Sequence, residues 1–130
     1  MTRFERAAQI WPVLTLSASQ RHVLTYEILA RITGMARQGF GPVLEPIQSY
    51  CLINRLPALS SLVVGVKTGM PGEGFIAAES VPSEQAAVFT WPWFERKPPT
   101  ASELAAATER LPSNGKSLES LKQELKSGAA

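Results

Sequence analysis

The sequence predicts a small α+β protein with a single folded domain, and three observations lead to this prediction. The chain has 130 residues, of which 45% are apolar and 18% charged, a balance typical of a globular domain that is long enough to bury a core. Apolar side chains recur at helical spacing in several segments. One β-branched run, residues 59–66, leads into a glycine-rich segment, which indicates a strand and a loop.

The first 24 residues predict a helix followed by a short extended stretch. Thr2 is suited to cap a helix over residues 2–16, because its hydroxyl can accept a hydrogen bond from the first turn. Pro12 would cost about 3 kcal/mol inside that helix, so we expect a kink or a break there. Residues 21–24 then indicate an extended stretch. The apolar row of the helix is Phe4, Ala8, Trp11 and Leu14 or Thr15.

Two further helices are expected on either side of a turn at residues 34–39. Thr25 and Gly34 suit the two ends of the first, residues 26–33, whose expected buried side is Ile28, Leu29 and Ile32. The second begins at Phe40 or Gly41 and ends near Asn54. Its expected core face is Phe40, Val43, Leu44, Ile47 and Cys51, and its expected outward face is Glu45, Gln48, Ser49, Leu52 and Arg55.

The apolar run of residues 59–66 predicts a buried strand, and residues 65–75 predict a tight loop or hairpin tip. That loop holds four glycines and a proline, and Lys67 and Thr68 are expected to be exposed on it. A fourth helix is expected from Pro82 or Ser83 to Phe94, with Val88, Phe89 and Trp93 docked on the core.

From residue 99 the composition changes to Ala, Ser, Glu and Lys. We therefore divide the chain into a domain, residues 1–98, and a tail, residues 99–130. The tail is expected to be partly disordered or to form two short helices, residues 102–111 and 117–126, that dock elsewhere.

The residue content argues against catalysis by the common side-chain constellations. The chain contains no aspartate, a single histidine, His22, and a single cysteine, Cys51. These numbers rule out Ser-His-Asp and Cys-His-Asp arrangements and a zinc cage of His and Cys ligands. Glu27, Glu45 and Glu73 fall in separate segments, as solvated charges usually do. We expect no enzyme activity, no catalytic residue, no cofactor and no metal.

The charge and hydropathy of the chain permit nucleic-acid binding without requiring it. The net charge is +2, and the basic residues are spread singly among glutamates instead of forming a dense stripe. No segment approaches the roughly 20 apolar residues that a membrane span needs. A lone cysteine is compatible with a reducing compartment, so we expect a cytoplasmic protein without membrane partners.

The order of the expected elements is helix, short strand, helix, turn, helix, strand, glycine-rich loop and helix. Residues 24–30 read Leu-Thr-Tyr-Glu-Ile-Leu-Ala, residues 36–41 read Ala-Arg-Gln-Gly-Phe-Gly, and Leu56-Pro57 precedes the apolar run. Together these segments resemble the DNA-binding domain of alkylguanine-DNA alkyltransferases and of the catalytically dead alkyltransferase-like proteins. The resemblance covers roughly residues 24–74. It implies a winged-helix-like domain with a helical core, a short β-sheet and a glycine-rich wing, which the C-terminal tail assigned from composition would follow.

The resemblance also implies roles for particular residues. Tyr26 matches the family's tyrosine, which helps to rotate a nucleotide out of the duplex. Arg37 matches the arginine that fills the gap in the base stack, although alignment on Gly41 places Gln38 there instead. The family's Pro-Cys-His-Arg acceptor is replaced by Pro-Ala-Leu-Ser from residue 57, and Cys51 lies on a core face. Alkyl transfer is therefore rejected.

The leading hypothesis is a non-enzymatic, accessory DNA-binding module that contacts duplex DNA mainly through phosphates. Glu45 on the same helix face would repel phosphate. The rival hypothesis is a protein-interaction domain that kept the fold without binding nucleic acid. The aromatic segment of residues 89–94 favours it, and Trp91 and Trp93, if exposed instead of docked, would mark a protein-binding patch. The expected DNA-binding residues are Tyr26, Arg37, Gln38, Gln48, Ser49, Arg55, Lys67 and Thr68.

Overall fold

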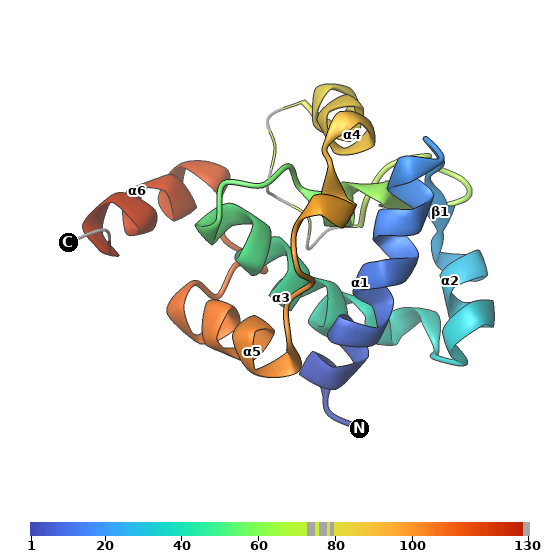
Figure 1. Cartoon of the computed structure of the whole chain (residues 1–130), viewed down its shortest axis with the longest axis horizontal. Coiled ribbons are helices and arrows are strands. Elements are labelled where there is room, and N and C mark those ends of the chain that lie inside the picture. Colours follow the sequence, from blue (N-terminus) through green and yellow to red (C-terminus); the bar gives the residue numbers. More distant parts are fainter. Residues whose placement is uncertain (73–74, 76–77, 79, 129–130) are drawn as a thin grey trace.

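The computed structural model describes residues 1–72, 75, 78 and 80–128, which are mostly helical (Figure 1). Its α-helices are α1 (Arg3–Ser19), α2 (Tyr26–Thr33), α3 (Phe40–Ile53), α4 (Val81–Thr90), α5 (Ala101–Arg110) and α6 (Leu118–Gly128). Two short strands, β1 (Leu24–Thr25) and β2 (Val63–Val64), pair in parallel, and 3-10 helices occur at Arg37–Gly39, Leu59–Leu62 and Trp93–Glu95. This content agrees with the expected small α+β domain.

Of the kink or break expected at Pro12, the break is wrong, because α1 continues through the proline to Ser19. Its N-terminus is capped as predicted, because the Thr2 hydroxyl accepts from the Glu5 N–H and the Glu5 carboxylate accepts from the Thr2 N–H. Ile10 and Leu14, on either side of the proline, are fully buried. Burying each such side chain contributes about 1.5–3 kcal/mol, which offsets the cost of the proline.

Helix α2 has the predicted bounds and both predicted caps. The Thr25 hydroxyl accepts from the Ile28 N–H at 3.1 Å, and Gly34 ends the helix in the left-handed conformation with φ 74°. Of its three expected core residues only Leu29 is buried, whereas Ile28 and Ile32 are exposed. The expectation for these two was wrong because α2 packs mainly along β1 and the 3-10 helix that follows it, and leaves this side to solvent.

The predicted strand over residues 59–66 is mostly not a strand. Its first half, Leu59–Leu62, is a buried 3-10 helix, and only Val63 and Val64 pair with β1. Of the stretch expected over residues 21–24, only Leu24 belongs to a strand, and Arg21 adopts a left-handed φ of 60°. The described residues contain no third strand beside these two.

Helix α3 lies in the middle of the molecule, between α1 and α5 (Figure 1). Its predicted start and its predicted core face are both confirmed. The core-facing side chains, all buried, are Phe40, Val43, Leu44, Ile47 and Cys51.

The C-terminal segments supply part of the same core. Helix α4 ends at Thr90, before the predicted end, and the predicted docking of Val88 and Trp93 is confirmed by their burial. In the segment expected to be a tail, α5 packs against α1 and α3 and buries Leu104 completely. The two short helices expected there are present, and Leu121 of α6 is also buried.

Candidate functional site

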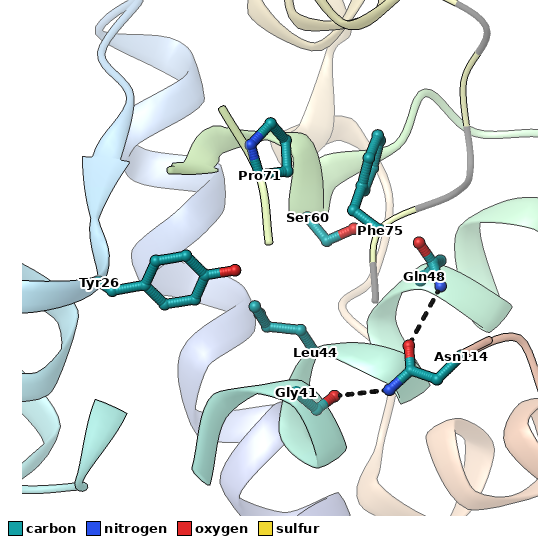
Figure 2. A pocket seen from close by; sticks show the side chains of 8 residues that line it. All are labelled: Tyr26, Gly41, Leu44, Gln48, Ser60, Pro71, Phe75 and Asn114. Carbon is teal, nitrogen blue, oxygen red and sulfur yellow. Dashed lines mark hydrogen bonds between the residues drawn. The ribbon is translucent and has the colours of Figure 1, made fainter. Parts of the chain in front are cut away.

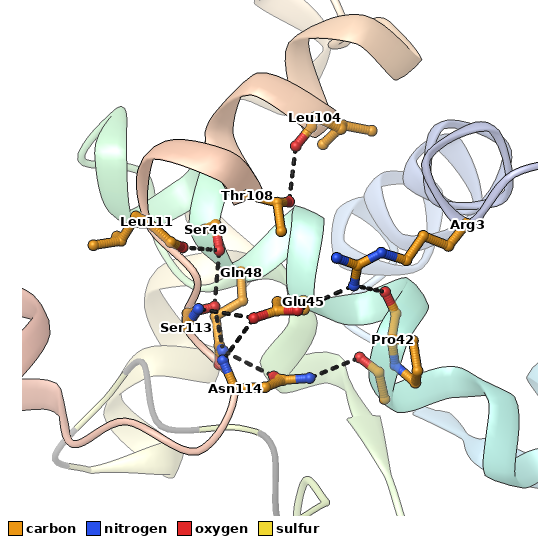
Figure 3. A network of polar contacts seen from close by, with 11 residues as sticks. Arg3, Pro42, Glu45, Gln48, Ser49, Leu104, Thr108, Leu111, Ser113 and Asn114 are labelled. Atoms are coloured by element: carbon orange, nitrogen blue, oxygen red, sulfur yellow. Dashed lines mark hydrogen bonds and ion pairs between the residues drawn. The ribbon is translucent and has the colours of Figure 1, made fainter.

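Two of the expected DNA-binding residues, Gln48 and Ser49, do not face outward. Both are buried under the segment that links α5 to α6 (Figure 3). The Ser49 hydroxyl donates to the Leu111 carbonyl at 2.7 Å, and the Gln48 amide donates to the Ser113 hydroxyl at 3.0 Å. The expectation of an outward polar face is therefore wrong for this pair, because the linker covers it.

Glu45, expected beside them, holds the same linker in place. Its carboxylate accepts from the backbone N–H groups of Ser113 and Asn114 at 2.8 and 2.9 Å and forms an ion pair with Arg3 at 3.0 Å. Burial acts to raise the pKa of Glu45, but these hydrogen bonds and the nearby arginine outweigh it and hold the pKa below its usual value. Its charge is thus satisfied inside the protein and is not presented to an incoming phosphate.

Three other expected residues come together on one surface. Arg37, Lys67 and Thr68 line a surface hollow of about 420 Å³, together with Glu27, Gly65 and Val66. Arg37 lies so near the loop backbone that a Cβ added at Gly65 would be 3.5 Å from its guanidinium nitrogen. Arg37 and the loop, which are far apart in the sequence, therefore lie within van der Waals distance of each other.

Arg37 is held over Tyr26 by two contacts. Its guanidinium forms an ion pair with Glu27 at 3.0 Å and lies 5.4 Å from the centre of the Tyr26 ring. The side chains of Arg37 and Glu27 are 57% and 42% exposed, so both are accessible to solvent. Glu27 was expected only as a solvated surface charge, and no spacing in the sequence indicated its pairing with Arg37.

Tyr26 anchors the glycine-rich loop through a hydrogen bond to its backbone. Its hydroxyl oxygen accepts from the Gly72 N–H at 3.0 Å, and a Cβ at Gly72 would come within 2.5 Å of that oxygen. The approach of the loop to the tyrosine therefore requires glycine. At this point Tyr26 is half-buried, so its hydroxyl is occupied in anchoring the loop.

The loop after β2 closes on itself in a tight turn, as predicted. The Gly65 N–H donates to the Met70 carbonyl at 3.0 Å, and Gly69 has the positive φ of 66° that such turns need. Lys67 and Thr68 are exposed on it. Glu73 and Gly74, which belong to the expected wing, lie outside the described residues.

The two remaining expected residues are exposed. Gln38 lies beside Arg37 in the 3-10 helix that precedes α3. Arg55 follows the C-terminal end of α3, with φ 56°. Because a helix of this length spans about 20 Å, Arg55 is remote from Arg37, which precedes the opposite end of α3. We define the basic cluster as Tyr26, Arg37, Gln38, Lys67 and Thr68.

The aromatic segment of the rival hypothesis is only partly available. Trp93 is buried, and its indole N–H donates to the Val88 carbonyl at 2.9 Å. Trp91 is 39% exposed and Phe94 is 68% exposed. The docking pair expected from the sequence, Trp91 and Trp93, is therefore replaced on the surface by Trp91 and Phe94.

Other chemistry finds little support in the described part of the chain. Burial raises the pKa of Cys51 to about 12, so its thiol is protonated at neutral pH. No group of three or more His, Cys, Asp or Glu side chains among the described residues is placed to hold a metal ion. None of the described helices is both long and apolar enough to cross a bilayer.

Comparison of the chain with protein-family models, with curated proteins and with solved structures finds no match.

Proposed function

We propose that this protein is a non-enzymatic DNA-binding module of winged-helix-like type that contacts duplex phosphates through the basic cluster. The observation that carries the proposal is the convergence of Arg37, Lys67 and Thr68 around one surface hollow. Arginine, lysine and threonine side chains are the groups that commonly contact phosphate oxygens. Arg37 is distant in the sequence from the adjacent pair Lys67 and Thr68, so the fold, and not proximity along the chain, brings Arg37 to this surface.

The basic cluster is suited to contact the DNA phosphate backbone and is less suited to read the edges of the bases. The polar side chains of α3 that would reach base edges, Gln48 and Ser49, are buried. Phosphate contacts carry no sequence information of their own, so the expected binding is weak, salt-sensitive and accessory to another component.

The proposal is tested by fluorescence anisotropy of a short labelled duplex at low and moderate salt. The Arg37→Ala variant should bind about tenfold more weakly, because it removes one charge-assisted phosphate contact. Arg110→Ala, an exposed arginine in the last turn of α5, is the matched control and should bind like the wild type. Equal effects of the two variants, or no binding at low salt, would contradict the proposal.

A second duplex carries an alkylated guanine. Preference for this duplex is the result that an alkyltransferase-like role predicts. Equal affinity for the two duplexes would mean that the protein contacts the DNA backbone without recognising the alkylated base.

A protein-interaction function is the second candidate, and the exposure of Trp91 and Phe94 favours it. Such an aromatic interface keeps its affinity as salt rises, whereas phosphate contacts lose theirs. This candidate predicts that the chain does not bind DNA and instead associates with a protein partner in a salt-resistant way. Phe94→Ser should abolish that association.

A further inference from the structure

A second, smaller site lies beside Tyr26, under the glycine-rich loop (Figure 2). Its cavity volume is about 30 Å³, on the scale of one small polar group. Apolar side chains form part of its wall, and hydroxyl, amide and carbonyl groups form the rest. None of its described lining residues is charged; they are Tyr26, Gly41, Leu44, Gln48, Ser60, Pro71, Phe75 and Asn114.

Ser60 is the observation that points to a ligand. The residue is 95% buried, at 5% exposure, and its hydroxyl oxygen has no hydrogen-bond partner among the described residues. An unpartnered buried hydroxyl weakens a fold, because its hydration is lost without replacement. A hydroxyl kept at such a cost on the wall of a cavity is suited to bind something that enters the cavity.

Two neighbouring groups add to the hydrogen-bonding capacity of the pocket. The Tyr26 oxygen accepts from the Gly72 N–H, so its own hydrogen is left to donate, and the ring points its hydroxyl toward the pocket (Figure 2). The Asn114 side-chain carbonyl accepts from the Gln48 amide at 3.5 Å and keeps a second lone pair. Donors and acceptors are thus both present, without a charge on any described lining residue.

We propose that this pocket binds the carboxamide group of a small neutral amide. The ligand carbonyl accepts from the hydroxyls of Tyr26 and Ser60, and its NH₂ group donates to the Asn114 side-chain carbonyl. A carboxylate of the same shape is rejected, because no described cationic side chain lines the pocket to offset the loss of its hydration. The remainder of the ligand projects past Pro71 and Phe75, whose apolar surfaces contact it.

The test is an NMR titration of the full chain with acetamide and, separately, with acetate, its charged counterpart of equal shape. Acetamide should produce saturable shifts of the Gly41 backbone amide and the Gln48 side-chain amide, and acetate should not. Ser60→Ala should weaken acetamide binding about tenfold through the loss of one buried hydrogen bond. The melting temperature of Ser60→Ala should equal or exceed that of the wild type, because the variant lacks the unpartnered hydroxyl.

Ser61→Ala is the matched control. Its hydroxyl is also buried and without a partner among the described residues, but it does not line the pocket, so this variant should bind acetamide like the wild type. Absence of saturable shifts, equal binding of acetate, or unchanged affinity in Ser60→Ala would overturn the proposal. The titration contains no DNA, so its result is independent of the proposed DNA contact.

Discussion

Glu27 is the residue on which the strength of the proposed DNA contact depends most. Its carboxylate pairs with Arg37 at 3.0 Å on an exposed surface, where an ion pair contributes only about 0–1 kcal/mol. One of its oxygens is buried without a partner among the described residues. A phosphate approaching Arg37 must therefore compete with a weakly held carboxylate.

Replacement of Glu27 by glutamine should tighten DNA binding. The change removes the competitor of phosphate and one negative charge, so we expect the affinity to rise by about threefold to tenfold at low salt. Anisotropy measures the effect. Glu119→Gln, an exposed glutamate in the first turn of α6, makes the same change in net charge away from the cluster. Equal gains in the two variants would show that net charge alone is responsible.

The sequence allowed part of the site to be predicted at this scale. Arg37 and Lys67 were both expected at the surface, and both are exposed in the same hollow. Gln48 and Ser49 were misplaced because their covering partners, Ser113 and Leu111, lie 65 and 62 residues further along the chain. Helical spacing separates one face from another, but it does not tell which polar face a distant segment will cover.

At the scale of the elements, the helix ends were the most predictable features. Thr2, Thr25 and Gly34 act within a few residues of themselves, so their capping roles follow from local geometry. Of the kink or break expected at Pro12, the break does not occur, because the burial of Ile10 and Leu14 offsets the local cost of the proline. The exposure of Ile32 depends likewise on which neighbours α2 has, and no local pattern provides that information.

Glu45 joins the linker between α5 and α6 to helix α3, and acid should release it. Its native pKa is lowered, so its contribution to stability is present above the unfolded-state pKa and is lost as pH falls through the native one. The unfolding free energy of the wild type should therefore decrease below about pH 5. Urea unfolding across this range should give a flatter profile for Glu45→Gln. Parallel profiles for the two proteins would contradict this role.

Helix α5 should be indispensable to the fold. Leu104 is fully buried where α5 packs against α1 and α3, so Leu104→Ala should cost about 2–5 kcal/mol of unfolding free energy. Leu16→Ala, at an exposed position on α1, is the control and should cost much less. Similar midpoints of urea unfolding for the two variants would mean that α5 is a dispensable tail.

At the scale of the whole molecule, one core joins the first helix of the chain to the segments near its end. Helices α1, α3 and α5 pack together around it, and the short sheet and the glycine-rich loop lie on one side, where the basic cluster forms. The overall net charge of +2 is small, so the proposed binding depends on local placement of charge. Composition at the scale of the chain could not predict this placement.

The salt dependence of duplex binding tests the central claim most directly. We would measure the association constant from about 50 to 200 mM salt for the wild type, Lys67→Ala and, as control, Lys97→Ala, which is an exposed lysine outside the cluster. Phosphate contact through the cluster predicts a steep negative slope of log K against log salt, shallower by about one in Lys67→Ala and unchanged in Lys97→Ala. A flat wild-type slope, or the same slope in all three proteins, would contradict the account.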